Sequence, residues 1–162
     1  MSSDGQSGAR AMPDGAEVRP ARAEEVEGLL PLMRAYCDFY DSSPSDQGLR
    51  EMAEALIADP EQGALFVARD RGHGAVGFAA MGWKWSSTRG ARVGVLEDLF
   101  VTPEGRGRGF AEALIEACAQ CCRERGAPAL EWYTAPDNHR AQAVYDRVGG
   151  RPETWIQYEL EL

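Results

Sequence analysis

The spacing of apolar residues predicts two helices followed by three strands in the first two thirds of the chain. Between residues 23 and 40, apolar side chains recur every three or four positions, as on one face of a helix. A shorter helical pattern covers residues 47–58 and ends before Pro60. Strands are then expected over residues 63–70, 75–85 and 93–102. The third of these is apolar on both faces, which is typical of a central strand covered on both sides.

The rest of the chain predicts helices over residues 109–125 and 138–149, the second capped by Asp137 or Asn138, with a strand over 128–135 between them. A short edge strand near residues 16–21 opens the series, and the alternating tail, 154–162, closes it. The order βααβββαβαβ predicts an α/β domain over residues 16–162: a central mixed sheet with helices on both faces. Residues 1–15 lack periodicity and are expected to form a disordered leader, in which Met12 is a second possible start.

Composition and charge narrow the possible partners. The 162-residue chain is 44% hydrophobic, which is enough for one domain with a core. Its formal net charge of −9 argues against nucleic acid as a partner. No apolar run is long enough to cross a bilayer, and the N-terminus has no apolar signal core, so we expect no membrane partner and a cytoplasmic protein.

Three of the four cysteines, Cys118, Cys121 and Cys122, form a CxxCC sequence that resembles part of a metal site. No second pair and no suitably placed histidine complete it, so we expect no metal. At helical spacing the three share an apolar face with Leu114, and we interpret them as reduced core cysteines.

The turn between the third strand and the next helix, Arg106-Gly-Arg-Gly-Phe-Ala111, suits an anion. Backbone N–H groups at a helix start have no partners and carry partial positive charge, and glycines let a ligand approach them closely. A phosphate or pyrophosphate is therefore the natural ligand. A Walker loop is excluded because no Lys-Ser or Lys-Thr follows, and the dinucleotide fingerprint lacks its third glycine. From these residues alone, a plain strand-to-helix turn that binds no ligand is an alternative.

The region from Gly94 to Gly149 resembles the GNAT superfamily of acetyl-CoA-dependent N-acetyltransferases. Arg106-x-x-Gly109-x-Ala111 is similar to the family's pyrophosphate loop, and Asn138, Ala141 and Tyr145 match its last helix. The stretch Leu-Glu-Asp-Leu-Phe-Val over 96–101 looks most like the diamine (spermidine/spermine-type) acetyltransferase branch. The sequence departs from the pattern at Gly105, Phe110 and Gly150, which affects packing rather than the loop amides.

The resemblance implies a GNAT fold, acetyl-CoA as co-substrate and pairing of subunits into a homodimer through the last strand. It also implies a splayed central strand whose backbone meets the acetyl and pantetheine groups. The cofactor-binding residues implied are Leu99, Phe100, Val101, Arg106, Gly107, Arg108, Gly109, Phe110, Ala111, Glu112, Asn138, Ala141 and Tyr145.

Acetyl transfer to an amine also requires a group that accepts a proton and a group that donates one. An alkylammonium with a pKa of about 10.4 must lose a proton, and the departing thiolate must gain one. Glu97, in the central strand, is the candidate base or amine anchor, with a structural ion pair as the alternative. Asp98 would share its site only if a bulge intervened, because neighbouring strand residues face opposite sides. By resemblance, Tyr145 is the candidate acid.

Aromatic and acidic residues that could frame a cationic acceptor form the predicted amine pocket. The set is Glu97, Glu131, Trp132, Tyr133, Trp85 and Tyr40, with Asp38, Asp41 and Trp83 as further candidates. We therefore predict transfer of acetyl from acetyl-CoA to a small cationic amine in a ternary complex. A protein or peptide amine acetyltransferase is the alternative, and a non-catalytic acyl-CoA-binding regulator is the second alternative.

Overall fold

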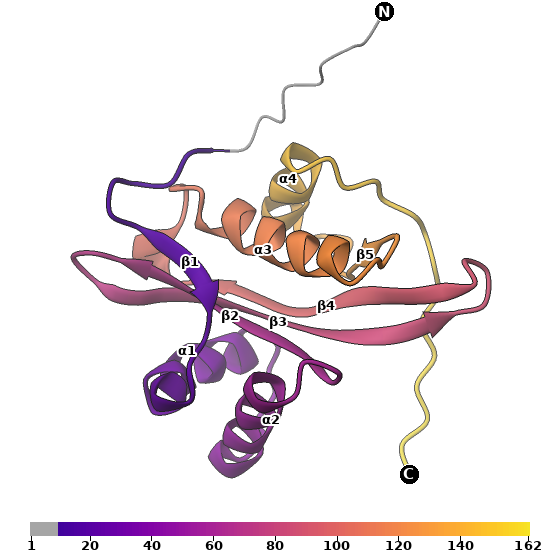
Figure 1. The fold of residues 1–162 in the computed structure, drawn as a ribbon, viewed down its shortest axis with the longest axis horizontal. Helices are drawn as coiled ribbons and strands as arrows, with labels where there is room; N and C mark the ends of the chain where they lie inside the picture. Colours follow the sequence, from indigo (N-terminus) through magenta and orange to yellow (C-terminus); the bar gives the residue numbers. More distant parts are fainter. Residues whose placement is uncertain (1–9) are drawn as a thin grey trace, which may run out of the picture.

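A computed structural model describes residues 10–162 and has a five-stranded sheet between two helical layers (Figure 1). The strands are β1 (Glu17–Pro20), β2 (Gly63–Asp70), β3 (Gly74–Ser86), β4 (Ala91–Val101) and β5 (Leu130–Glu131). They lie in chain order across the sheet; β1 to β4 are antiparallel neighbours, and β5 is parallel to β4. This mixed sheet confirms the predicted fold class.

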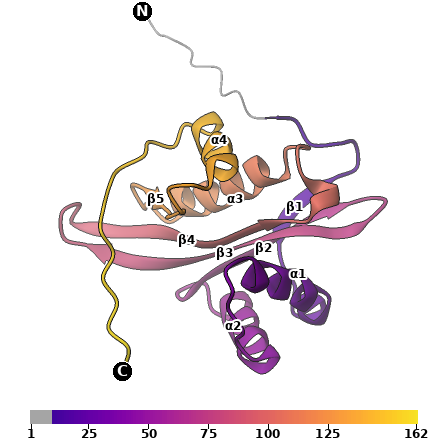
Figure 2. The ribbon, with the colours of Figure 1, turned by 180° about the vertical axis from the view of Figure 1, so that it is seen from behind.

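Helices α1 (Val26–Phe39) and α2 (Asp46–Ala58) cover one face, and α3 (Phe110–Glu124) and α4 (His139–Arg147) lie on the other (Figures 1 and 2). Short 3₁₀ turns, η1 (Ala23–Glu25) and η2 (Pro103–Gly105), precede α1 and the glycine-rich turn. Each layer has its own apolar core, built around Leu29, Met33 and Phe78 on the first face and Phe110 and Leu114 on the second. Because β4 contributes to both cores, its pattern is apolar on both faces, as predicted.

The cysteine prediction is confirmed: Cys118 and Cys122 are buried free thiols of the α3 core, and Cys121 is half-buried beside them. Burial raises the pKa of the Cys122 thiol to about 11, so it stays protonated at neutral pH. Among residues 10–162, no group of three or more His, Cys, Asp or Glu side chains is placed to hold a metal ion. Within the same residues, no helix is both long and apolar enough to cross a bilayer.

The prediction of a last strand over 154–162 is wrong for this single chain. Residues 150–162 have no regular structure, and from Arg151 onward they leave the body of the domain as an extended, exposed segment (Figures 1 and 2). The predicted strand 128–135 is likewise reduced to Leu130–Glu131. A strand needs a hydrogen-bonded neighbour, and with β5 this short the alternating tail finds no long edge to pair with.

The expected leader over residues 1–15 lies largely outside the described residues. Its described part begins at Arg10, runs beside the start of α3 and packs Met12 against the α3 core.

Candidate active site

A cleft opens where β4 and β5 part. The two strands are paired only at Gly94–Leu130 and Val95–Glu131, so the following residues of β4 have no neighbour on that side. The space is lined from β4, the glycine-rich turn, α4 and the end of α1. Its lining residues are Tyr36, Phe39, Tyr40, Leu99, Phe100, Val101, Gly105, Arg106, Gly107, Gly109, Phe110, Ala111, Glu112, Asn138, Arg140, Ala141, Val144, Tyr145 and Arg147. Most of the cofactor-binding residues expected from the sequence therefore lie on one cleft.

A bulge in β4 lies at Glu97. Leu96 is opposite Met81 on β3, whereas Asp98 is opposite Ala80, so Glu97 is an extra residue without a partner. Its side chain is exposed, although a regular position in a strand covered on both sides would bury it, and Asp98 is half-buried. Glu97 and Asp98 were expected to share one site only if a bulge intervened here, and the structure has that bulge.

The turn before α3 presents unpaired amides to the cleft. Gly107 and Gly109 have positive φ values of 73° and 80°, a left-handed conformation that glycine adopts without strain. The first N–H groups of α3 have no partner within the helix. Arg10 Nη1 donates to the Gly107 carbonyl at 3.1 Å, and a Cβ at Gly109 would meet the Arg10 carbonyl oxygen at 2.5 Å. A side chain at 109 would thus displace the N-terminal segment whether or not a ligand is bound.

Two arginines make the mouth of this turn cationic. Arg106 donates through Nε to the Val101 carbonyl at 3.0 Å, and burial together with the nearby Arg140 cation lowers its pKa. Two like charges lining one cleft favour an anion between them. Arg140 was missed in the sequence, although it stands inside the α4 motif between Asn138 and Ala141. Arg108 does not line this cleft: its guanidinium turns to Asp70 at 2.8 Å and lies over the Phe110 ring.

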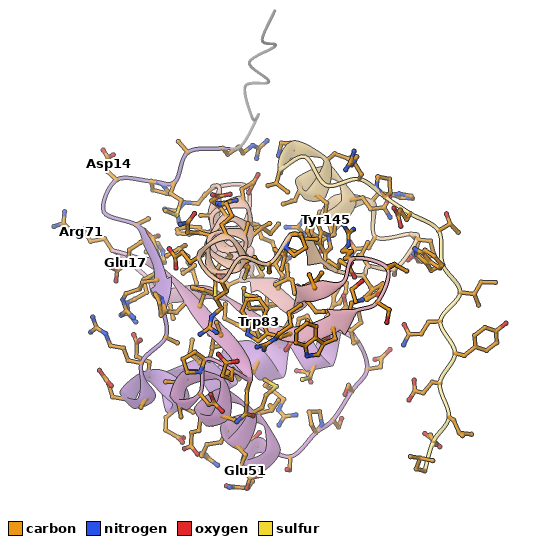
Figure 3. The ribbon with its side chains drawn as sticks, turned by 45° about the vertical axis from the view of Figure 1, so that its right-hand side comes forward. Asp14, Glu17, Glu51, Arg71, Trp83 and Tyr145 are labelled. Atoms are coloured by element: carbon orange, nitrogen blue, oxygen red, sulfur yellow. The ribbon has the colours of Figure 1, made fainter. Side chains whose placement is uncertain are left out.

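Tyr145 reaches the cleft from α4 (Figure 3). Its ring packs edge-on against Trp132, with centroids 5.4 Å apart. Burial raises the pKa of Tyr145, and the Tyr40 hydroxyl adds to this effect. The phenol is therefore protonated at neutral pH and can donate a proton. Trp132 supports the ring from behind and does not line the cleft.

The end of α1 closes the cleft with an aromatic wall, defined here as Tyr36, Phe39 and Tyr40. The Tyr40 ring centroid lies 5.0 Å from that of each of the other two. The Tyr36 hydroxyl donates to the Glu97 carbonyl at 3.3 Å, which ties the wall to the bulge. Of the three wall residues, only Tyr40 was identified from the sequence. Tyr36 could have been found as well, because it lies one helical turn before Tyr40 and therefore on the same face.

Several predicted amine-pocket residues lie elsewhere. Glu131 pairs with Lys84 at 2.6 Å and Arg89 at 3.5 Å, so its charge is already compensated. Trp83 packs between the guanidiniums of Arg92 and Arg125, at 5.4 and 5.5 Å, away from Tyr145 (Figure 3). The remaining candidates are largely exposed and do not line the cleft: Trp85, Tyr133, Asp38 and Asp41.

Two cofactor candidates have additional roles in the chain itself. Asn138 caps α4, where its Oδ1 accepts from the Ala141 amide at 3.3 Å. Glu112 is 5% exposed and pairs with Arg147 of α4 at 2.8 Å. The cap stabilises the start of α4, and the ion pair holds α4, and with it Tyr145, against the start of α3.

Comparison with known proteins agrees with this geometry. Residues 29–150 match the model of the family described as the acetyltransferase (GNAT) family. An uncharacterized N-acetyltransferase of Bacillus subtilis, YhfO, is 27% identical over 146 residues, covering 90% of this chain and 97% of that protein. An uncharacterized N-acetyltransferase of Archaeoglobus fulgidus is 36% identical over 135 residues, covering 80% of this chain and 88% of that one.

Among solved structures, AAC(6')-Iy in complex with a bisubstrate analogue, CoA-S-monomethyl-acetylneamine, is 25% identical with a TM-score of 0.78. The match covers 92% of this chain and 100% of that chain.

Proposed function

The chain belongs to the acetyltransferase (GNAT) family, and we propose that its acceptor is a small molecule with a cationic primary amine. The protein is an acyltransferase, an acetyl-CoA-dependent N-acetyltransferase. The choice of acceptor within that class is the proposal. A relative from Bos taurus, 26% identical and named a thialysine N-epsilon-acetyltransferase, and the solved AAC(6')-Iy, named an aminoglycoside N-acetyltransferase, support a small molecule.

The observation that carries the proposal is the aromatic wall beside two carboxyls. Aromatic faces attract a cation, and Tyr36 links the wall to the strand that bears Glu97 and Asp98. An ammonium entering from this side would meet aromatic rings and negative charge together. The exposed Glu97 side chain is suited to attract the cation from solvent, which is the anchor role considered from the sequence.

The residues of the cleft fit acetyl-CoA. The unpaired amides at the start of α3, together with Arg106 and Arg140, would hold its pyrophosphate. The free edge of β4 over Leu99–Val101 would receive the pantetheine arm and the acetyl carbonyl. When bound, acetyl-CoA supplies the activated thioester. Tyr145 then donates its proton to the departing sulfur.

Turnover of acetyl-CoA tests the proposal against a panel of polyamines, amino acids, aminoglycosides and a basic peptide. Release of CoA with a small amine supports it, and a diamine as the best acceptor would support the diamine-type branch. Turnover with the peptide alone would favour the protein or peptide alternative. Tight CoA binding with no turnover would favour a regulator.

We also propose a homodimer in which the tail of each subunit pairs with its partner. The tail exposes an alternating apolar row, including Ile156 at 78% and Tyr158 at 89% exposure, and an exposed row of this kind requires cover. Light scattering at micromolar concentration should give twice the mass of 17.7 kDa. A monomer would refute it. The four free cysteines fit a reducing compartment, so the cytoplasm is part of the proposal.

A further inference from the structure

The bulge of β4 leaves two adjacent carboxyls in different surroundings. Glu97 is exposed, whereas Asp98 is half-buried and aligned with Ala80, a residue of the core under α1 and α2. Residues directly opposite one another in an antiparallel pair share a face, so Asp98 faces the α1 layer. Leu96, two positions earlier, belongs to the core under α3. The bulge therefore turns Asp98 toward the acceptor wall.

We propose that Asp98 takes the proton that the acceptor ammonium must lose, and that Tyr36 positions this carboxyl; the assignment rests on the proposed function. The Tyr36 hydroxyl donates to the Glu97 carbonyl at 3.3 Å and lies beside the Asp98 carboxyl, so it fixes the bulge that carries this carboxyl. The same tyrosine lines the cleft and lies near Tyr40 and Tyr145. A cation held by the aromatic wall thus lies on the side that Asp98 faces.

No other group nearby compensates the Asp98 charge. Within the described part of the chain, no arginine, lysine or histidine forms an ion pair with it; the groups that face it are Tyr36, Cys37 and the neighbouring Glu97. Burial raises the pKa of Asp98, and the Glu97 charge raises it further, while the nearby Tyr36 hydroxyl opposes the change. A half-buried, unpaired carboxylate destabilises a fold. It is also a stronger base, since its pKa is closer to that of an amine.

The step is balanced without any other reactant. The Asp98 carboxylate and the ammonium become a carboxylic acid and a neutral amine. The amine nitrogen then bonds to the acetyl carbon, the carbon–sulfur bond breaks, and Tyr145 protonates the sulfur. The Asp98 proton and the second proton of the new amide nitrogen leave to solvent, from which Tyr145 is reprotonated.

Asp98→Asn tests the assignment, with Glu97→Gln as the matched control on the adjacent residue. Using whichever acceptor the panel identifies, kcat/KM of Asp98→Asn should fall roughly 100-fold or more at pH 7. The loss should shrink toward pH 10, as free amine appears in solution. The melting temperature should stay equal or rise, because a buried charge is removed. Glu97→Gln should raise KM for the amine and change kcat little.

Tyr36→Phe separates positioning from packing. Loss of the Tyr36 hydroxyl beside Asp98 should raise the pKa of Asp98, so the acidic limb of the kcat/KM profile should move to higher pH, while CoA affinity stays unchanged. Asp98→Asn with wild-type activity and an unaltered pH profile would overturn the proposal, as would a pH-dependent loss confined to Glu97→Gln. A peptide acceptor would refute the small-molecule proposal and leave this test intact. No turnover by the wild type with any acceptor would overturn both.

Discussion

The ion pair between Glu112 and Arg147 should decide how firmly Tyr145 is held. No residue of α4 is fully buried, so this helix depends on half-buried contacts and on its tie to α3. Glu112 Oε1 accepts from Arg147 Nε at 3.0 Å and from Nη2 at 2.8 Å. The carboxylate is 5% exposed, and the arginine side chain is 32% exposed. We predict that Glu112→Gln destabilises the protein and lowers kcat.

The magnitude follows from what the amide keeps and loses. Glutamine has nearly the same shape and still accepts a hydrogen bond, but the bond is no longer between charged groups. Bonds to charged groups contribute about 1.5–3 kcal/mol and neutral ones about 1. Since Arg147 is partly solvated, we expect a loss of about 1–2 kcal/mol, which lowers Tm by roughly 2–8 °C for a chain of this size. Tyr145 lies two positions before Arg147, so kcat should fall as its ring loses a fixed position.

Thermal unfolding and steady-state kinetics measure both effects. The control is Glu116→Gln, one turn further along α3, where the partner Arg123 is 54% exposed and the glutamate 69% exposed. An exposed pair of this kind contributes about 0–1 kcal/mol, and its loss should leave kcat unchanged. If Glu112→Gln has the same Tm as Glu116→Gln and retains full kcat, the buried ion pair does not anchor α4.

Three further results are expected. Tyr145→Phe should lower kcat roughly 10–100-fold with unchanged CoA affinity by calorimetry, and an unchanged kcat would remove the acid role. Asp70→Asn should raise the KM for acetyl-CoA several-fold at constant kcat, because Asp70 holds Arg108 in the loop; equal KM values would show that the loop is held without it. Glu25, whose pKa the Arg19 guanidinium lowers to about 2, stabilises the fold above its unfolded pKa of about 4.3. This stability should be lost as pH falls toward 2, and an acid titration of Tm should be flatter in Glu25→Gln.

The spacing of apolar residues predicted best those helices and strands in which one face is buried in the core. The strand at 63–70 agrees at both ends, and α3 agrees within one residue of 109–125, because one face of each is set by the core. The tail shows the converse. Its alternation of apolar and polar residues is typical of a strand. Such a pattern does not show whether a sheet edge is available for pairing, and the single chain offers the tail no long edge.

The site was predictable where it depends on backbone and local order. Gly107 and Gly109 lie before α3 because the turn needs their positive φ, which sequence alone can suggest. The charged residues were less predictable, since a side chain's partner comes from elsewhere in the fold. Glu131 is neutralised by Lys84 of β3, and Arg108 by Asp70 of β2, and neither contact has a local signal.

On the proposed mechanism, the bulge at Glu97 allows one strand to serve both substrates. Beyond it, Leu99 and Val101 pack with the α3 layer, while Asp98 and Phe100 lie on the α1 face with the aromatic wall; Leu99, Phe100 and Val101 all line the cleft. In a regular strand Asp98 would share the face of Leu96, under α3, and the amine and its base would be on opposite sides of the sheet. The opening between β4 and β5 is then the place where groups from the two faces can meet. On the proposed mechanism, acetyl transfer therefore depends on the bulge and the opening together: the bulge places Asp98 on the acceptor side, and the opening gives it access to a thioester held from the other side.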